Sequence, residues 1–379
     1  MQIMKQQTSS AHARRRWGPR QLASLLGVET PEVRTLRVLV AGKLTALVSP
    51  GGGEVQMQRT LSELRRLGVE ARWWRPWEQR LAEADVVHLF GSEREHLSIV
   101  AAARQLGIPV VLSTVAWFDL ASLWHESWSM PRRLLVCGKH LLRSAAPRLP
   151  SWRRQLYQAC DRLLPNSRAE AAQLVKMFGV DAEKIRVVPN GADERFATGD
   201  PEPFIRQVGC RRFVLYAGRI EPRKNQLTFL RAMHGANVPV VVLGDAVPGH
   251  EEYYNACRQA ADANVQFVSR IEHGNTLLAS AYAACGALAL ASWYETPGLV
   301  ALEAGMSGVP LVLPKVGCAE EYFGRHAEYV SAGDLHEIRS KTLAALARDR
   351  SPELASLVRE QYSWRAAAQA TRVAYAEVV

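Results

Sequence analysis

Short runs of apolar residues alternate along the chain with longer segments in which apolar positions recur at helical spacing. This alternation is typical of βαβ units, in which helices join parallel strands. The runs predict strands at 36–41, 85–90, 109–113, 162–165 and 185–189, and then at 213–217, 239–243, 265–268, 287–292 and 309–313. Their nearly continuous Val and Leu content favours strands that are buried on both faces.

Helices are expected between these strands, and residues 168–178 give the clearest one. Ser167 suits its N-cap, and Glu170, three residues later, completes the pattern of a capping box. The Pro- and charge-rich stretch 193–211 separates two sets of βα units and predicts an interdomain linker. The last segment, 363–379, predicts a single amphipathic helix.

The chain of 379 residues exceeds the usual size of a single core, so we expect two domains. The fold predicted is α/β, with two Rossmann-like parallel sheets facing each other across a cleft. The expected parts are a basic N-terminal extension (1–33), an N-terminal domain (34–195), a C-terminal domain (196–362) and the final helix (363–379). Ligands of such folds bind at the carboxyl ends of the strands, which is where we looked for chemistry.

Composition narrows the class of protein. Apolar residues make up 48% and charged residues 22%, as in ordinary globular chains. No apolar run reaches the roughly 18–20 residues of a membrane span, and the basic start lacks the apolar region of a secretory signal. The six cysteines are scattered without a C-x-x-C pair, which argues against a zinc site and against a disulfide framework. We therefore expect a cytoplasmic protein.

The net charge of +10 is unevenly distributed. Residues 1–37 are rich in Arg, and residues 131–156 carry Arg132, Arg133, Lys139, Arg143, Arg148, Arg153 and Arg154 without any acid. A solvated basic face is one interpretation, and attraction to an anionic partner is the other. Because 131–156 interleaves these cations with Leu, Val and Trp, it favours peripheral contact with an anionic membrane at the inner face. No aromatic-interleaved sheet face or groove-reading helix predicts a nucleic-acid partner.

Two cations follow the predicted strand 213–217. Gly218 permits a turn, and Arg219 and Lys224 lie on the loop beyond it. An Arg, which can bind oxygens in pairs, and a Lys, which acts as a point charge, together suit a diphosphate. Taken alone, basic residues on such a loop are as readily explained by contact with water.

A second candidate element follows the predicted strand 287–292. Pro297 and Gly298 predict a turn, and the free N–H groups of Gly298, Leu299 and Val300 would start a helix that attracts an anion. Glu303, one turn inside that helix, could accept both hydroxyls of a ribose, and Glu295 precedes the turn. Each acid by itself could also be an exposed surface residue.

A third, weaker signal is the glycine-rich turn 49–58, in which Gly51, Gly52 and Gly53 precede a helix. Glycines allow the backbone to approach a phosphate or a sugar closely. The pattern is not G-x-G-x-x-G, and no acid closes a second strand as a dinucleotide site requires.

Together these segments resemble a known family. ETPGLVALE (295–303) resembles the E-x7-E motif of retaining GT-B glycosyltransferases of family 4, also called group 1. The segments similar to other parts of that family are GGGE (51–54), CDRLLPNSRAEA (160–171), VVPNGAD (187–193), GRIEPRK (218–224), VVLGD (241–245) and VQFVSRI (265–271). They occur in the family's order from about residue 36 onward, so the resemblance covers nearly the whole chain.

The resemblance implies a role for each matching residue. Arg219 and Lys224 would hold the diphosphate of a UDP- or GDP-linked sugar and stabilise its charge as it leaves. Glu295 would bind the donor sugar, and Glu303 the ribose. The remaining implied donor contacts are the N–H groups of Gly298, Leu299 and Val300, Arg270 and Ile271 beside the base, and Gly52 and Gly53 from the opposite domain. The final helix would cross back onto the N-terminal domain.

The resemblance also implies transfer with retained anomeric configuration, by front-face attack in which the leaving phosphate takes the acceptor proton. No D-x-D motif is present, so we expect no metal and no cofactor. Many relatives carry a His after the third strand, whereas STVAWFDL (113–120) places Val115 there. His88, Ser113 and Asp119 are the acceptor-side candidates, each of which could equally be structural.

Three functions are therefore open. The first is a glycosyltransferase that acts on a polysaccharide, glycolipid or small-molecule acceptor. The second is a GT-B relative that works as a sugar-nucleotide epimerase. The third is a membrane-surface binding protein with a vestigial donor site. The sequence does not specify the nucleotide, the sugar or the acceptor, because acceptor choice depends on N-terminal loops.

Overall fold

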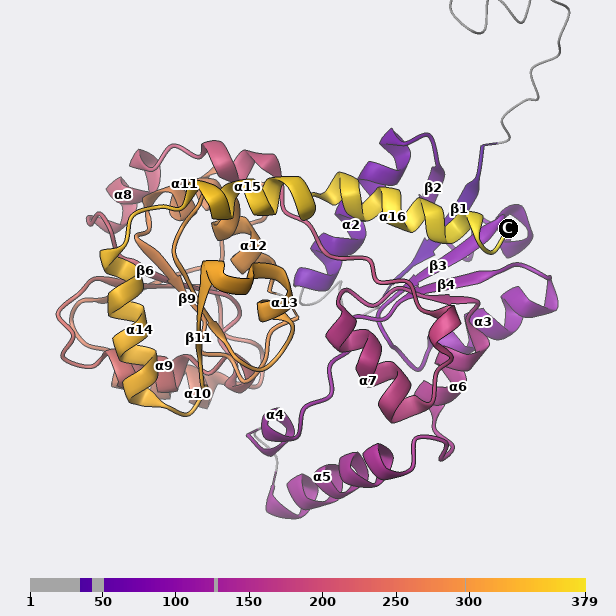
Figure 1. Ribbon diagram of the computed structural model, residues 1–379, viewed down its shortest axis with the longest axis horizontal. Coiled ribbons are helices and arrows are strands. Elements are labelled where there is room, and N and C mark those ends of the chain that lie inside the picture. The colour runs from indigo at the N-terminus through magenta and orange to yellow at the C-terminus, as the bar shows by residue number, and fades with distance from the viewer. Residues whose placement is uncertain (1–34, 43–50, 126–128, 297) are drawn as a thin grey trace, which may run out of the picture. The chain divides into compact units, whose positions relative to one another are not determined.

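The computed structural model describes residues 35–42, 51–125, 129–296 and 298–379, so the predicted extension 1–33 lies outside the described residues. Leu36–Val379 form one unit that contains two β-sheets with helices packed around them (Figure 1). Every strand pair in both sheets is parallel. The predicted α/β architecture with two Rossmann-like sheets is therefore confirmed.

The first sheet has the strand order β2-β1-β3-β4-β5. Its strands are β1 (Arg37–Ala41), β2 (Glu70–Trp73), β3 (Val86–Phe90), β4 (Val110–Ser113) and β5 (Arg162–Leu163). Its helices are α2 (Gly52–Arg66), α3 (His96–Gln105), α4 (Leu120–Trp124), α5 (Met130–Ala145), α6 (Trp152–Ala159) and α7 (Arg168–Phe178). Every residue of the central strands β3 and β4 is buried, which explains their continuous apolar sequence.

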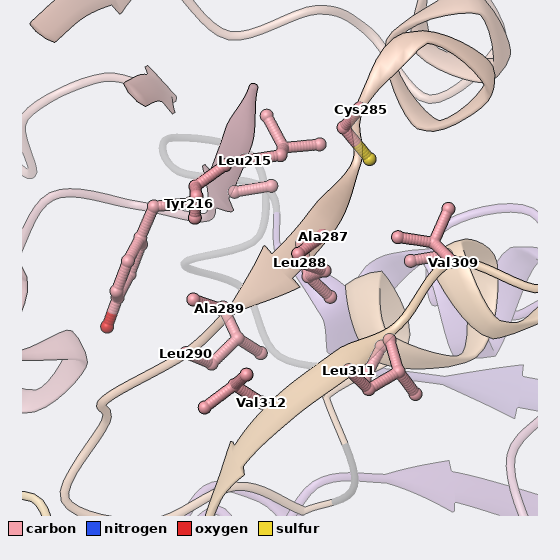
Figure 2. Close-up of a cluster of buried hydrophobic side chains, with 14 of the residues drawn as sticks. Leu215, Tyr216, Cys285, Ala287, Leu288, Ala289, Leu290, Val309, Leu311 and Val312 are labelled. Atoms are coloured by element: carbon pink, nitrogen blue, oxygen red, sulfur yellow. The ribbon is translucent and has the colours of Figure 1, made fainter. Parts of the chain in front are cut away.

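The second sheet has the order β11-β10-β9-β6-β7-β8. Its strands are β6 (Val214–Ala217), β7 (Val240–Leu243), β8 (Val265–Val268), β9 (Ala287–Ala289), β10 (Leu311–Pro314) and β11 (Ala327–Val330). Its helices are α8 (Glu202–Val208), α9 (Gln226–Met233), α10 (Glu251–Ala260), α11 (Thr276–Ala284), α12 (Leu299–Met306), α13 (Ala319–Phe323), α14 (Leu335–Ala347) and α15 (Pro352–Gln361). Side chains of β6, β9 and β10, such as Leu215, Leu288 and Val312, are buried together in its core (Figure 2).

Two strands were not predicted, and one predicted strand is not formed. β2 (EARW) and β11 (AEYV) are edge strands in which only Ala71 and Val330 are fully buried, and neither strand has a continuous apolar run. The predicted strand 185–189 is reduced to an isolated bridge between Leu163 and Ile185. The strands β2 and β11 mix polar and apolar residues, and for this reason the hydrophobic pattern does not detect them, whereas the edge strands β5 and β8 were predicted.

The stretch 193–211, which was predicted to be an interdomain linker, contains helices and buried side chains. It contains the 3-10 helix η4 (Glu194–Thr198) and α8, and Phe196 and Phe204 are completely buried in the core of the second sheet. The stretch therefore connects the two sheets and also covers one of them.

The final helix, α16 (Trp364–Ala376), begins after the N-cap Ser363 and packs against α2 of the first sheet (Figure 1). Trp364, Ala368 and Tyr375 share one core cluster with Val38 and Val40 of β1. The last helix thus completes the core of the N-terminal half. No helix among the described residues has both the length and the apolar character that a membrane crossing requires.

Candidate functional site

A cavity of about 700 Å³ is lined by loops at the carboxyl ends of strands of both sheets. It brings together the residues predicted to contact a donor, which are Gly52, Gly53, Arg219, Lys224, Arg270, Ile271, Glu295, Gly298, Leu299, Val300 and Glu303. The predicted turn residue Pro297 lies outside the described residues. Strand ends of a parallel sheet meet at one edge, which explains how residues far apart in the chain converge here.

The loop after β6 carries the two predicted cations in a fixed backbone conformation. Asn225 adopts a left-handed conformation with φ of 59°, and its side-chain amide donates to the carbonyls of Ala291 (2.9 Å) and Ala332 (2.8 Å). The Tyr216 hydroxyl donates to the carbonyl of Lys224. These contacts tie the loop to neighbouring strand ends, so the backbone that carries Arg219 and Lys224 is positioned before any ligand binds.

Lys224 and Glu295 form a buried ion pair. Lys224 Nζ lies 2.6 Å from Glu295 Oε1, and Ser292 Oγ donates to the same oxygen at 2.6 Å. Burial alone would raise the pKa of Glu295, but the charges of Lys224 and Arg223 and these hydrogen bonds outweigh it and lower the pKa. The carboxylate is therefore ionised, and its Oε2 retains lone pairs for a ligand hydroxyl.

Arg223 is a further cation at the cavity that the sequence analysis did not select. Its guanidinium lies 2.9 Å from Glu221 Oε1 and 5.2 Å from the centre of the Tyr294 ring. Burial acts to lower the pKa of Arg223, but Glu295, Tyr294 and Glu221 together raise it. In the sequence, only its position directly before Lys224 indicated that Arg223 lies at the cavity.

The cavity also receives the N-terminus of α12. Gly298 is the N-cap with φ of 81°, a conformation that favours glycine. The N–H groups of Leu299 and Val300 have no partner within the helix, so they are available to an anion. The segment before α12 passes close to Gly317, because a Cβ at that residue would stand 2.1 Å from the Glu295 carbonyl oxygen.

The glycine-rich turn approaches α12 from the N-terminal half. Gly51 is the N-cap of α2, and its N–H donates to Glu54 Oε2 at 2.5 Å. A Cβ at Gly52 would lie 3.6 Å from Leu299 Cδ1, and one at Gly51 would lie 3.5 Å from Arg219 Nη1. Two helix N-termini and Arg219 therefore border the same space, which gives it a positive potential.

Glu303 is held by two side chains from the β8–α11 region. His273 Nε2 lies 2.9 Å from Glu303 Oε1, and the Tyr282 hydroxyl donates to Oε2 at 2.6 Å. His273 Nδ1 faces the guanidinium groups of Arg59 (3.2 Å) and Arg195 (3.3 Å), which can only donate. Nδ1 is therefore the acceptor, and Nε2–H donates to Glu303. Neither His273 nor Tyr282 belongs to a recognisable motif, so the sequence analysis missed both.

Arg270 and Ile271 line the cavity after β8, as predicted. The backbone N–H of Arg270 donates to Asp245 Oδ1 at 3.1 Å, which ties this loop to the end of β7. Gly244, next to Asp245, has φ of 152°, and a Cβ there would lie 2.0 Å from the carbonyl oxygen of Gly218. Only glycine allows these two strand ends to approach so closely.

The structure places the acceptor-side candidates His88 and Ser113 away from the cavity. Both side chains are buried and neither lines the cavity. His88 Nε2 lies 2.9 Å from Ser113 Oγ, and Nδ1 lies 2.6 Å from the Tyr375 hydroxyl. Burial lowers the pKa of His88 to about 3, so it stays neutral. Asp119 does not line the cavity either, because it lies at the start of α4.

In the loop between β4 and α4, Val115 lines the cavity. Its φ of 42° is unusual for a β-branched side chain and marks a strained backbone. The carboxylate of Glu170 holds the loop by accepting from Thr114 Oγ1 (2.5 Å) and the Ala116 N–H (2.7 Å). Ser167 Oγ accepts from the Glu170 N–H as the predicted capping box requires, but the Glu170 side chain accepts from the N–H of Asn166 (2.8 Å), one residue before the N-cap.

Within the ranges that the structure describes, no three His, Cys, Asp or Glu side chains cluster in the manner of a metal site. The arrangement can bind a polyanion next to two carboxylates that accept hydrogen bonds. All six cysteines are free thiols.

Comparison with known proteins matches each half of the chain to a family. Residues 50–196 match Glycosyltransferase Family 4, and residues 204–357 match Glycosyl transferases group 1. A D-inositol 3-phosphate glycosyltransferase of Kribbella flavida is 34% identical over 181 residues, which are 43% of this chain and 42% of the relative. One from Streptomyces scabiei is 31% identical over 252 residues, which are 62% of this chain and 53% of the relative. The matches thus span about half the length of these relatives.

Solved structures share the fold at low sequence identity. Sucrose-phosphate synthase from Thermosynechococcus elongatus aligns with a TM-score of 0.70 and 16% identity, over 91% of this chain and 99% of that one. HepE from Anabaena, solved in complex with UDP, aligns with a TM-score of 0.59 and 19% identity, over 91% and 97% of the two chains.

Proposed function

This chain belongs to the GT-B glycosyltransferases of family 4, and on that premise we propose that it transfers a sugar from a nucleoside-diphosphate sugar to an acceptor hydroxyl. The supporting observation is that Arg219, Lys224, the N-terminus of α12 and Glu303 all line one cavity. A diphosphate leaving group needs positive potential, a ribose needs hydrogen-bond acceptors, and this cavity offers both.

The cations and the helix N-terminus are proposed to stabilise the diphosphate as its bond to the sugar breaks. Groups that are already positioned where charge develops require no reorganisation during the reaction. Arg219 Nη2 lies 3.5 Å from Glu221 Oε1, and its side chain remains 41% exposed, so it can turn toward a phosphate. Lys224 uses one of its three donors on Glu295, which leaves two for the ligand. In this proposal the reaction proceeds without a metal ion.

The donor is proposed to be a UDP- or GDP-linked sugar. Glu303 retains free lone pairs for the ribose hydroxyls, and Glu295 retains Oε2 for the hydroxyls of the sugar. The complex of the similarly folded HepE with UDP supports the uridine form.

The proposed transfer keeps the anomeric configuration. The bond between the anomeric carbon and the diphosphate oxygen breaks, and the acceptor oxygen bonds to the same face of that carbon. The acceptor proton passes to the leaving phosphate oxygen, so no protein base is needed.

The experiment that tests this function measures thermal stabilisation by UDP and by GDP in the presence of a metal chelator, followed by a donor screen with released nucleoside diphosphate as the readout. Arg219→Ala should reduce the stabilisation. Arg206→Ala, on an exposed position of α8 outside the cavity, should not. No shift with any nucleoside diphosphate would refute the proposal, and conversion of the donor sugar without release of nucleotide would favour an epimerase.

The protein is further proposed to bind the surface of an anionic membrane through α5. Its residues Leu134, Leu135, Leu141 and Leu142 are 59%, 57%, 57% and 58% exposed, and its sequence MPRRLLVCGKHLLRSA contains no acid. Cations attract anionic lipid while exposed leucines enter the interface. Vesicles rich in phosphatidylglycerol should sediment the protein, less so at high salt or with Leu134→Ser/Leu135→Ser. Equal recovery with neutral vesicles would contradict this.

A further inference from the structure

A second cavity, of about 570 Å³, lies in the N-terminal half next to α5. Its volume falls within the range of ligand-binding pockets, about 300–1,000 Å³. It is lined mainly by apolar and aromatic side chains, which include Trp117, Phe118, Leu142, Trp152 and Phe178. Such a lining favours a hydrocarbon chain.

The charged side chains that line this cavity are cationic, and His140 and Ser151 are its other polar lining residues. Lys139, Arg143 and Arg153 contribute to it, and no Asp or Glu is among its lining residues in the described part of the chain. The Arg153 guanidinium lies 4.2 Å from the Trp152 ring centre and 5.7 Å from that of Phe118. An anionic group bound beside the apolar lining would therefore meet positive charge.

A single loop separates the two cavities. Val115 lines the first, and Trp117 and Phe118, two and three residues later, line the second. The Trp117 ring stacks on Tyr294 with centroids 6.2 Å apart, and Tyr294 lines the first cavity. A ligand in the second cavity is thus next to the wall of the candidate donor site.

The α5 helix connects the second cavity to the exposed leucines. Val136, Lys139, Leu142 and Arg143 of α5 line the cavity, whereas Leu134, Leu135 and Leu141 are exposed outside it. In Figure 1, α5 follows α4 and lies beside α7, and α4 and α7 also contribute residues to the cavity. Leu142 belongs to both sets, because it lines the cavity and is 58% exposed, so it marks where the cavity meets the exposed leucines of α5.

We propose that the second cavity binds the apolar chain of the acceptor, a membrane lipid with an anionic head group. Lys139, Arg143 and Arg153 hold the anionic group, and the loop 115–118 places the lipid's hydroxyl toward the first cavity. This inference rests on the proposed function, and it specifies the acceptor as an amphipathic lipid.

The test measures binding of lysophosphatidic acid, kept below its critical micelle concentration, by the change in tryptophan fluorescence. Val136→Trp, which fills the cavity from α5, should weaken binding by about tenfold or more. Ala145→Trp, an exposed position on the same helix outside the cavity, is the matched control and should bind like the wild type. Thermal stabilisation by UDP, measured on both variants, establishes that they are folded.

The result expected for the charges is that Lys139→Glu weakens binding while Arg148→Glu, exposed and outside the cavity, does not. Unchanged binding in Val136→Trp, or equal weakening in both Trp variants, would overturn the proposal and indicate surface adsorption. Glycerol phosphate binding as tightly as the lipid would also overturn it, in favour of a plain phosphate site. Lipid binding without any nucleotide response would remove the acceptor role and the proposed function while leaving a lipid site.

Discussion

The ammonium group of Lys224 lies 2.6 Å from a carboxylate oxygen of Glu295, and the two side chains are only 11% and 3% exposed. Removal of one member of such a pair leaves the other charge buried without a partner, which is strongly destabilising. The ion pair therefore links the loop after β6, which carries Lys224, to the loop after β9, which carries Glu295.

The first prediction concerns this pair. Glu295→Ala should lower the free energy of unfolding by about 3–5 kcal/mol, because Lys224 would be buried without a counter-charge. Urea denaturation measures the loss. The exposed pair Arg211–Glu202 provides the control, since Glu202→Ala should change stability by less than about 1 kcal/mol. An equally small effect of Glu295→Ala would mean that the pair is not charged in the native protein.

The second prediction concerns the support of Glu303. Tyr282→Phe removes the 2.6 Å hydrogen bond to Glu303 Oε2 and leaves the aromatic packing intact. We expect nucleotide affinity to fall by about fivefold, which corresponds to about 1 kcal/mol for one hydrogen bond. Titration calorimetry with UDP measures it. Tyr329→Phe, which loses a hydrogen bond to Gly324 far from the cavity, should bind UDP unchanged.

The third prediction is a pH dependence from His88. The folded protein holds the pKa of His88 at about 3, whereas the unfolded chain takes up a proton near the ordinary value of 6.5. Stability from this group is therefore present above pH 6.5 and is lost as the pH falls toward 3, by about 2 kcal/mol at about pH 5.

Glu170 acts in the opposite direction, because burial raises its pKa to about 7 and the folded state then binds the proton first. The His88 effect must therefore be read as a difference. Wild type and His88→Gln are unfolded in urea at about pH 7.5 and about pH 5, and the wild type should lose more stability. Identical losses would show that His88 is not buried neutral.

The fourth prediction tests the close approach of two strand ends. Gly244→Ala places a Cβ 2.0 Å from the Gly218 carbonyl oxygen at a positive φ, so stability should fall by about 2–4 kcal/mol. Gly274→Ala, where a Cβ would meet nothing within 4 Å, should change it by less than about 0.5 kcal/mol. Melting temperatures that fall equally in both variants would contradict the geometry.

The sequence predicted the buried strands and the α7 helix from strong local signals, and the resemblance to the family supplied the donor-site residues that line the cavity. β3 and β4 are nearly continuous apolar runs, and Arg219, Lys224 and Glu295 lie on the loops that follow β6 and β9. The edge strands β2 and β11 were missed because half-exposed strands lack such a run. Local pattern therefore predicts what is buried more reliably than what lies at an edge.

Residues that act through distant contacts were not predictable. His273 and Tyr282 are functional candidates only because they reach Glu303, which lies 30 and 21 residues away in the chain. Both interpretations of His88 stayed open in the sequence because a histidine near a strand end looks the same whether its partner is a ligand or, as here, Tyr375 on α16. Such pairings are set by tertiary packing, which single-sequence periodicity does not report.

The packing of α16 on β1 and α2 also fixes an order of assembly. Tyr375 contacts His88 across a separation of 287 residues, so the N-terminal sheet keeps an open apolar flank throughout synthesis of the second sheet. During that interval we expect the nascent chain to expose this flank. A ribosome-bound fragment ending after α15 should therefore be captured by a hydrophobic-segment chaperone, and release should follow once α16 emerges.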